Sequence, residues 1–384
     1  MRARDFLKEV KTLGGFAVKV VNAVNDTEVD EAIKLDAPSK TIDPEELKGF
    51  LGRTVAGTKT KQDKFKPYIH RSQIKITQSD DPNDLWDLDD LRQKITTRPN
   101  TLLGTNTKMQ KSSTNDQVLY DITLPALSGI VIDEDTGEFV EITTCPNAGE
   151  CKLFCYARQG GFVMYPHNAM AAARSLNFLV NDPEGWFELL YAEILLAKAK
   201  AKVHKGGSLL VRWHDAGDFF SKAYVDLAFD LARSLPDVEF SAYTKSSNIA
   251  LGDKPDNFVI NFSTGAKPKD DKAVAAQTSA GKVVKQAVVV PKDVFQDTLA
   301  KQGNKLVKDE SGQTQFKDQA SVDLLRQRLA NKYNIDKNSI ITYNQMLSIP
   351  QGREPKWNVI VPAGSGDLAA ARRDVIYSFL LLHK

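Results

Sequence analysis

Alternating strand-like and helix-like segments restrict the fold of this chain more than any other feature of its sequence. From about residue 117 onward, short runs rich in β-branched and aromatic residues are separated by longer stretches of helical composition. The strand-like runs are VLYDITLP, GIVID, GEFVEITT, SLLVRWH, VEFSAYT and NFVINFS. Repetition of strand, helix and strand predicts an α/β fold with a parallel sheet and crossover helices, and it places functional groups beyond the carboxyl ends of the strands.

Several local signals add detail to this α/β pattern. The Asp-Glu-Asp-Thr-Gly turn between GIVID and GEFVEITT predicts a β-hairpin. A helix is expected from Pro183 to about Lys202, with Asp182 as its N-cap, and another over KAYVDLAFDLARSL. The close of the chain, from Trp357 onward, predicts a strand, a glycine-containing turn and a final amphipathic helix.

The chain divides into an N-terminal region and a larger α/β domain. Residues 1–115 are polar and irregular, which predicts an accessory arm or small domain, and the main domain covers 116–384. Within that domain, the stretch 266–345 is rich in Lys, Gln and Asp and is interpreted as an insertion. A length of 384 residues also fits a single α/β barrel that carries insertions.

Composition limits the cellular setting and the partners. The first twenty residues are interrupted by charges and lack the apolar core of a signal peptide, and no apolar stretch approaches the ~18 residues of a membrane span. Three cysteines, an odd number, argue against a disulfide-stapled secreted protein. We therefore expect a cytoplasmic protein without a membrane partner, whose net charge of +2 neither requires nor excludes nucleic acid.

All three cysteines lie in one short stretch, TTCPNAGECKLFCYA. Cys145, Cys151 and Cys155 have the spacing C-x5-C-x3-C, so a strand-to-helix loop could place their sulfurs around one centre. Thiolates favour soft metals, namely zinc or the irons of an iron–sulfur cluster. Three ligands leave one coordination position open, which is a defect in a structural zinc site but useful in a catalytic centre.

Other interpretations of the cysteines stay open. The segment is polar, which does not favour cysteines that are merely buried hydrophobic residues, but accidental clustering and a redox role for the thiols are both alternatives. Zinc is the alternative metal, with His167 or His214 as a fourth ligand. Metal binding is the interpretation that the residue types favour.

Polar residues also end the predicted strands, at the edge where an active site is expected. The candidates are His214, Asp215, Gly217, Asp218, Lys245, Asn261 and Ser263. Several have a structural alternative, because Asp218 could cap the next helix, His214 could be a neutral core residue and Lys245 could be a solvated surface residue. As a functional group, Lys245 could pair with a carboxylate or a phosphate.

A further motif, GSGDLAAARRD, lies near the C-terminus. Gly364 and Asp367 belong to a glycine turn before a helix, and such a turn can hold a phosphate through its free backbone N–H groups. Arg372 and Asp374 follow on the expected helix. The alternatives are that Asp367 only caps the helix and that the Arg-Arg-Asp trio only forms packed ion pairs.

Four ordered motifs resemble the phage gene-product-88 domain family, from about Leu103 to the C-terminus apart from the insertion. They are TCPNAGECKLFCYA, VRWHDAGDFFS, FSAYTKS and GSGDLAAARRDVIYSFLLLH. More distantly, the chain is similar to the radical S-adenosylmethionine enzymes. Those enzymes carry three cysteines, usually spaced C-x3-C-x2-C, in the loop after the first strand of a partial (β/α) barrel, with an aromatic residue before the last cysteine. Phe154 takes that place here, although the gaps between the cysteines are longer.

The resemblance implies a partial or complete (β/α) barrel of radical-SAM type, related to the TIM barrel. It implies a [4Fe-4S] cluster on Cys145, Cys151 and Cys155, with S-adenosylmethionine at the open iron. The segment 215–218 corresponds in position to the motif that holds the methionine amino group, so its two carboxylates would receive an ammonium and Gly217 would allow close backbone approach. With Asp215, Gly217 and Asp218, the implied cofactor-binding set comprises Phe154, Tyr156, His214, Asn261, Ser263, Gly364, Asp367 and Arg372, while Lys245 and Asp374 are the catalytic candidates.

Two functions from different classes follow. The first is a phage-encoded iron–sulfur enzyme of the host cytoplasm, which uses an electron donor and radical chemistry on a nucleotide, a nucleic acid or a small molecule. The second is a non-catalytic phage protein in which zinc or a cluster is structural and which binds nucleic acid or a host partner. The residues favour the enzyme without excluding the binding protein.

Overall fold

The computed structural model describes part of the chain. These residues are 38–43, 47, 51–52, 69–70, 87–105, 109–110, 113, 117–153, 155, 157, 165–205, 207–309, 312–363 and 367–381.

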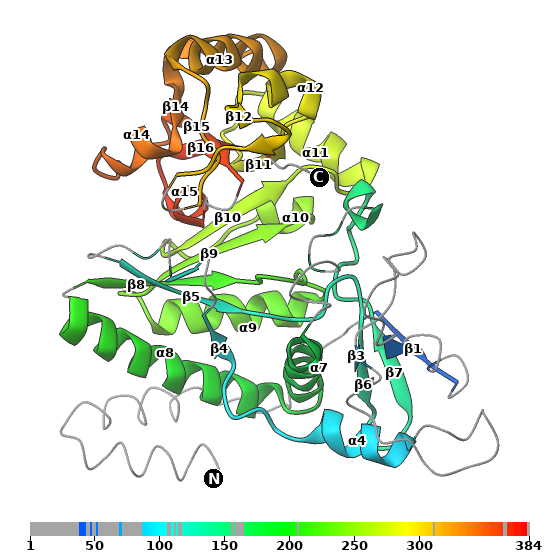
Figure 1. The fold of residues 1–384 in the computed structure, drawn as a ribbon. Coiled ribbons are helices and arrows are strands. Elements are labelled where there is room, and N and C mark those ends of the chain that lie inside the picture. Colours follow the sequence, from blue (N-terminus) through cyan, green and yellow to red (C-terminus); the bar gives the residue numbers. More distant parts are fainter. Residues whose placement is uncertain are drawn as a thin grey trace.

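Nine strands form the main sheet, in the order β14-β15-β16-β11-β10-β9-β8-β5-β4 (Figure 1). Along the chain they are β4 (Leu103–Gly104), β5 (Gln117–Ile122), β8 (Ser208–Trp213), β9 (Glu239–Thr244), β10 (Phe258–Ser263), β11 (Gln286–Val289), β14 (Ile340–Thr342), β15 (Trp357–Pro362) and β16 (Val375–Leu381). All neighbours pair in parallel except β4 and β5. The predicted parallel α/β sheet is therefore confirmed.

The sheet does not close on itself within the described residues. Its edge strands β14 and β4 each pair on one side only, so a complete barrel is not formed there. A partial barrel of the radical S-adenosylmethionine type stays a prediction.

Helices connect the strands in the expected alternation. They are α7 (Pro166–Asn181), α8 (Pro183–Lys205), α9 (Lys222–Ser234), α10 (Ser247–Leu251) and α11 (Pro268–Ser279). The predicted Asp182 cap is confirmed, because its Oδ1 accepts the Gly185 N–H at 2.8 Å. The Ser221 hydroxyl caps α9 in the same way.

The two faces of the sheet carry separate cores. On one face, α8 and α9 pack against large aromatic side chains that include Trp213, Phe240 and Phe258. On the other face, Leu119 of β5 and Val359 of β15 share one core with α14 (Tyr343–Leu347) and α15 (Asp367–Ala371). Strands near both ends of the sheet therefore contribute to the core that contains α15, and this short helix also contacts the inner strands β9, β10 and β16 (Figure 1).

The stretch 266–345, expected as an insertion, instead contributes to the main sheet. It supplies β11, which lies between β10 and β16, and the edge strand β14. It also contains α12 (Lys292–Phe295), η6 (Gln296–Thr298), β12 (Lys301–Gln302), β13 (Lys305–Leu306), α13 (Gln319–Tyr333) and η7 (Lys337–Ser339). Phe295 and Leu325 pack with Phe379 of β16, so this stretch shares a core with the sheet.

The predicted final amphipathic helix is wrong. The helix α15 ends at Ala371, and the run VIYSFLL at 375–381 forms β16 between β15 and β11. A strand covered on both faces carries apolar residues continuously, and such a run cannot be told from a buried helix by periodicity alone.

A small antiparallel sheet of β1 (Ser39–Thr41), β6 (Gly129–Ile132) and β7 (Phe139–Ile142) lies beside the main sheet, and it confirms the predicted hairpin. At the hairpin turn, Asp133 Oδ1 accepts the N–H groups of Asp135 and Thr136. The helix α4 (Leu88–Thr96) packs on β6 and α7, and β2 (Leu51–Gly52) pairs with β3 (Ile69–His70). Most of the expected 1–115 region lies outside the described residues. Within the described part, no helix has the length and apolar character of a membrane span.

Candidate functional site

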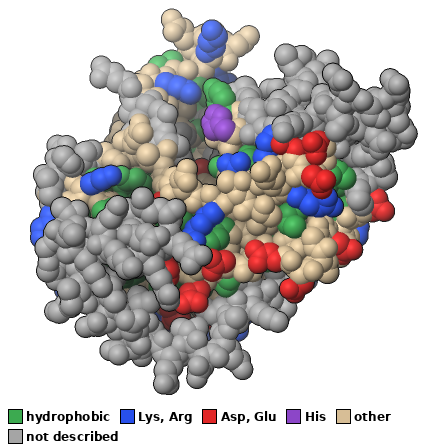
Figure 2. Space-filling model, turned by 90° about the horizontal axis from the view of Figure 1, so that it is seen from below, with side chains coloured by type: hydrophobic (Ala, Val, Ile, Leu, Met, Phe, Trp, Pro, Cys, Tyr) green, Lys and Arg blue, Asp and Glu red, His purple; other side chains and the backbone are tan. Residues whose placement is uncertain are grey.

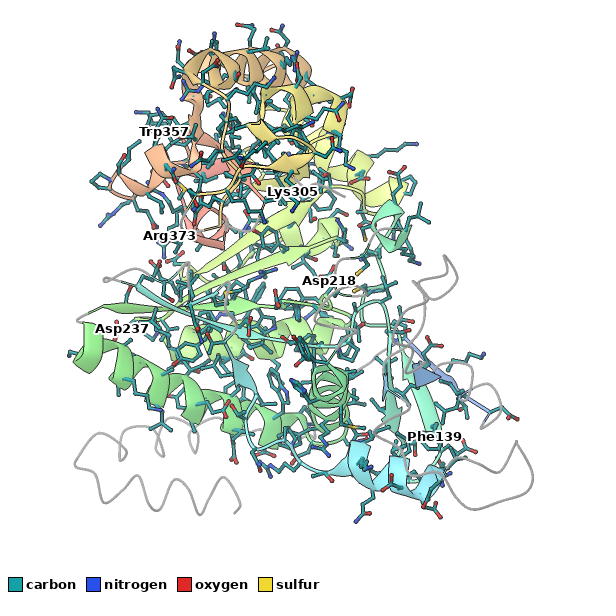
Figure 3. All side chains as sticks on the ribbon, viewed as in Figure 1. Phe139, Asp218, Asp237, Lys305, Trp357 and Arg373 are labelled. Carbon is teal, nitrogen blue, oxygen red and sulfur yellow. The ribbon has the colours of Figure 1, made fainter. Side chains whose placement is uncertain are left out.

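The loop that carries the three cysteines lies at the carboxyl ends of β8, β9 and β10. It follows β7, runs through the short helix η4 (Glu150–Leu153) and reaches α7. Asp218, after β8, donates its N–H to Thr144 O at 3.0 Å, and Lys267, after β10, donates to Asn147 O at 2.9 Å. Figure 3 labels Asp218 at this edge of the sheet. The predicted position at the strand ends is therefore confirmed for the cysteine loop.

Gly149 brings the loop into direct backbone contact with the turn after β10. A Cβ atom at this position would lie 2.0 Å from Ala266 O and 3.0 Å from Gly265 O. Ala148 pairs with Ala266 in an antiparallel bridge, and the Cys151 N–H donates to Gly265 O at 3.5 Å. The absence of a side chain at Gly149 thus sets how closely Cys151 approaches the sheet.

Cys145 is held by a residue with unusual backbone geometry. Leu127 has a φ of 68°, a value that branched residues rarely adopt. Its carbonyl accepts the N–H of Thr144 and the N–H of Cys145, and its own N–H donates to Cys145 Sγ at 3.3 Å. Hydrogen bonds to sulfur of this kind help to set the properties of thiolate-bound iron.

The thiols and two charged groups influence one another. Burial raises the pKa of the Cys145 thiol well above its usual range, and Asp218 and the other two cysteines raise it further. Burial also raises the pKa of Cys151, while the positive charge of Lys245 lowers it. The three thiols, Asp218 and Lys245 therefore form one electrostatically coupled group, the thiol site.

The thiol site fits a metal in donor type but is not arranged as a ligand set. All three cysteines are partly exposed, and the neighbouring cysteines help to raise the pKa of Cys145 and of Cys151, which places the three within electrostatic range of one another. Among the described residues, however, no group of three or more His, Cys, Asp and Glu side chains could hold a metal ion as placed. His214 and His167 do not supply a fourth ligand in such a group. Metal binding by the cysteines stays a prediction.

Asp218 lies beside the cysteine loop, to which its N–H is bonded, and is 4 % exposed. Its Oδ1 accepts the Phe219 N–H at 2.7 Å, and its Oδ2 accepts the Lys245 N–H at 2.8 Å. Burial raises the pKa of Asp218 to about 6, although these hydrogen bonds and one from Thr244 act against the rise. Its hydrogen bonds join the loop after β8 to the end of β9. Asp218 is not the N-cap of α9, because Ser221 takes that position.

Lys245 turns inward from the end of β9. Its Nζ donates to Ser263 Oγ at 2.7 Å, to Ser263 O at 3.0 Å and to Thr264 O at 2.6 Å. Burial lowers the pKa of Lys245, and the nearby Cys151, Asp218 and Asp271 act in the opposite direction. The solvated alternative does not describe this side chain, and Ser263 acts as its acceptor.

His214, Asp215 and Gly217 lie close together but do not form one site. His214 is 3 % exposed, and its Nε2 lies 2.8 Å from Tyr224 Oη. Burial, and then Arg212, lower the pKa of His214 to about 3. These features match the structural alternative of a neutral core histidine, and the cofactor role of His214 stays an untested prediction.

Asp215 forms an ion pair with Arg212 at 3.1 Å. The charge that was expected to receive an ammonium ligand therefore has a protein partner. Gly217 has a φ of +89°, and an added Cβ would lie 2.9 Å from Leu124 Cβ. Its role in the structure is to let the loop after β8 pass close to the segment after β5.

Asn261 faces α15 across the sheet. It is 1 % exposed, and its Nδ2 donates to Ala370 O at 2.8 Å. This amide holds the short helix against β10. Contact of Asn261 with a cofactor stays a prediction.

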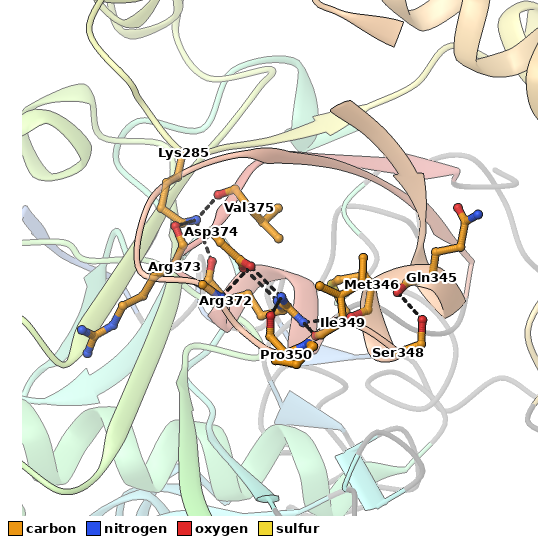
Figure 4. A network of polar contacts seen from close by, with 11 residues as sticks. Lys285, Gln345, Met346, Ser348, Ile349, Pro350, Arg372, Arg373, Asp374 and Val375 are labelled. Atoms are coloured by element: carbon orange, nitrogen blue, oxygen red, sulfur yellow. Dashed lines mark hydrogen bonds and ion pairs between the residues drawn. The ribbon is translucent and has the colours of Figure 1, made fainter. Parts of the chain in front are cut away.

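Arg372 and Asp374 form a packed ion pair (Figure 4). Arg372 Nη2 lies 2.6 Å from Asp374 Oδ2, and Nε donates to Oδ1 at 2.8 Å. The remaining guanidinium donors meet the carbonyls of Met346, Ile349 and Pro350. The contacts match the structural alternative, and the catalytic role of Asp374 and the cofactor role of Arg372 stay untested predictions.

Three predicted site residues, Phe154, Tyr156 and Gly364, lie outside the described residues. For Asp367 the structure describes the backbone, at the start of α15, but not the side chain.

Sequence reasoning missed several residues of these networks. Arg212 lies inside the apolar run SLLVRWH, and a charge in a buried strand was an available signal. Its guanidinium also lies over the Tyr243 ring, 5.2 Å from the centroid. Tyr224 and Lys285 had no comparable signal, because their partners are distant in sequence.

The surface seen in Figure 2 bears on a nucleic-acid partner. On the described part of that face, basic and acidic side chains are interspersed and no basic stripe stands out. Lys94, His167 and Arg174 line an open recess of about 400 Å³ with Met170 and Ala171. Lys94 is already paired with Asp90 at 2.8 Å, which reduces the positive charge there.

One family comparison matches the chain. The sequence model described as Gene product 88 matches residues 97–341, a range that includes the thiol site and the strands from β4 to β11. The match ends within β14, before β15 and β16. No curated protein and no solved structure matches the chain.

Proposed function

We infer that this protein, which belongs to the gene product 88 family, holds an iron–sulfur cluster on Cys145, Cys151 and Cys155 and acts as a radical S-adenosylmethionine type of enzyme. One observation carries the proposal. Backbone hydrogen bonds join the loop that carries the chain's three thiols to the carboxyl ends of parallel strands, where α/β enzymes place their active sites.

In this proposal, binding of the metal brings the three sulfurs together. Ligand loops commonly take their final arrangement only with the metal present, because binding and local folding are coupled. Two points of the loop are already fixed, because Leu127 holds Cys145 and the Gly265 carbonyl holds the Cys151 backbone. The segment around Cys155 would complete the set.

The residues beneath the loop have distinct tasks in the proposal. Asp218 orders the loop after β8 through the N–H groups of Phe219 and Lys245, and its charge helps to raise the pKa of the Cys145 thiol. A cluster bound here would supply one-electron transfer to a sulfonium ligand, with an external reductant as the electron source. A phage origin suggests a nucleotide or nucleic-acid substrate.

The first test measures the metal. Anaerobically purified protein should contain iron and sulfide in equal amounts and absorb broadly near 400 nm, a general property of such clusters. Cys151→Ser should lose most of the iron, because a hydroxyl is a poor ligand for a soft metal site. Lys152→Ala is the matched control, since it changes an exposed residue of the same turn and should keep the iron.

Zinc without sulfide would contradict the cluster and favour the alternative of a metal-binding protein without catalysis. The second test incubates cluster-loaded protein with S-adenosylmethionine and dithionite and measures 5′-deoxyadenosine. Failure to release it from fully loaded protein would reject the radical activity and leave the cluster assignment intact.

A further inference from the structure

A partly buried ammonium lies beside the thiol loop with its donors fully used. Lys245 Nζ has three protons, and the structure gives it three acceptors, namely Ser263 Oγ, Ser263 O and Thr264 O, at 2.6–3.0 Å. All three acceptors are neutral. Within the described residues Lys245 thus has its hydrogen bonds satisfied, while its positive charge has no carboxylate in contact.

The same short segment positions Cys151. Thr264 O accepts from Lys245, and the next carbonyl, Gly265 O, accepts from the Cys151 N–H. The Lys245 ammonium and the Cys151 backbone N–H therefore bind adjacent carbonyls of one turn. The side-chain charges agree with this placement, because Lys245 and Cys151 each shift the pKa of the other group towards its charged form.

We propose that Lys245 is the counter-charge of the thiol site, a positioning residue whose fixed ammonium stabilises the negative charge of metal-bound thiolates. The inference rests on the proposed function. Three thiolates bring three negative charges into a partly buried site that already holds Asp218, and uncompensated charge there is costly. The net charge around a cluster also sets its reduction potential.

The geometry separates this role from substrate binding. An ammonium that binds a phosphate or carboxylate must donate a proton to it, and all three protons of Lys245 already have protein acceptors. The positive charge of Lys245 acts on the thiolates without direct contact. The proposal therefore gives Lys245 a positioning role in place of the catalytic role expected from the sequence.

Lys285 provides a matched control. It is also partly buried, and its Nζ donates to the carbonyls of Arg372, Arg373 and Val375. Burial lowers its pKa to about 7, and the charged groups that act on it are Asp374, Arg372 and Lys254, none of which belongs to the thiol site. Replacing Lys285 removes a comparable ammonium without changing the charge beside the thiols.

The test compares iron retention and reduction potential in the full chain. Wild type, Lys245→Met and Lys285→Met are reconstituted with ferrous iron and sulfide without oxygen. Release of iron to a ferrous chelator and the midpoint potential are then measured. Lys245→Met should release iron on the order of tenfold faster, because one unit charge in a partly buried site alters the binding of a charged group by about that factor or more. Its potential should become more negative, since the reduced cluster carries one more negative charge. Lys285→Met should match wild type in both measurements, whatever its thermal stability.

Lys245→Arg keeps the charge and should recover most of the retention. If Lys245→Met does not fold, Lys245→Gln replaces it, since its amide keeps two donors for the Ser263 and Thr264 oxygens without the charge. Unchanged iron release and an unchanged midpoint potential in the neutral variant would overturn this inference and leave the proposed function intact. Wild type that binds no cluster would overturn the proposed function and this inference with it.

Discussion

Gly149 shows how much the thiol site depends on a missing side chain. We predict that Gly149→Ala displaces the cysteine loop, because the new methyl group would lie 2.0 Å from Ala266 O. A backbone oxygen cannot move aside as a flexible side chain can, so the loop must shift, at a cost of about 1–3 kcal/mol. The free energy of unfolding, measured in urea, and the iron content should both be lower than in wild type.

Gly352→Ala is the control for this substitution. Its added Cβ would meet only the Asp374 side chain at 3.4 Å, which is close to ordinary van der Waals contact. The control should retain its iron. If Gly149→Ala retained iron equally well, the close backbone contact would not matter for the site.

His214 predicts a dependence of stability on pH. Its pKa is about 3 in the folded chain against 6.5 for an ordinary histidine, because burial disfavours the charged ring. Between these values the unfolded chain binds a proton that the folded chain does not. The stabilisation is therefore fully present above pH 6.5 and is lost as the pH falls towards 3, by up to roughly 1.4 kcal/mol per pH unit.

His214→Asn should remove this part of the pH dependence, since asparagine does not titrate and tolerates the φ of +67°. Asp218 acts in the opposite sense, because its raised pKa stabilises the fold as the pH falls from about 6 to 3.8. The comparison must therefore be the difference in urea stability between variant and wild type from pH 7 to pH 4. A difference that does not change with pH would contradict the assignment of His214 as a buried neutral group.

Single residues were predictable from the sequence where their chemistry and their place at a strand end coincided. The cysteine loop, Asp218, Lys245 and Ser263 were all expected at one edge of the sheet, and the structure brings them together there. Their individual contacts were not predictable. The Nζ of Lys245 reaches carbonyls 18 and 19 positions away, and only the folded sheet brings such groups into contact.

Between elements, the Arg372–Asp374 pair fixes the turn from α15 to β16. Although burial works against ionisation, hydrogen bonds from Arg372 and from the Gly352 N–H keep the pKa of Asp374 below its usual value. We predict that Arg372→Ala destabilises the protein by about 3–5 kcal/mol in urea unfolding, because it leaves a buried carboxylate without its partner.

The double variant Arg372→Met with Asp374→Leu should recover much of that loss, since it removes both charges together. Iron content should be unchanged in the double variant if the pair is structural. Loss of iron with a stable fold would show instead that these residues belong to the functional site.

Elements were predictable where one signal dominated. The hairpin at Asp133 and the helices α8 and α9 carried turn residues, caps and helix-forming composition, and all three formed as expected. The strands β11 and β14 lie in polar sequence and have only four and three residues, too few to establish a period. The apolar run of β16 fits a helix or a buried strand equally well, and only its neighbours β15 and β11 decide between them.

For the whole molecule, the order of strands predicts which segment can fold. The family match ends at residue 341, but β16 pairs with both β11 and β15, and β15 pairs with β14. We predict that a chain ending at residue 341 does not form the native sheet, because β11 and β14 each lose a partner. Circular dichroism and urea unfolding should show a cooperative transition for the full chain and none for the shortened one. A cooperative transition in the shortened chain would show that the matched range is a folding unit by itself.

The central position of β16 also has a consequence for synthesis on the ribosome. Strands β5 to β11 leave the exit tunnel long before the last strand does, and the open edge of β11 keeps unpaired N–H and C=O groups until that strand arrives. A nascent chain therefore exposes a surface on which strands of other chains can pair until β16 has been made. Stalling of translation between β11 and β16 should for this reason favour aggregation more than stalling before β11.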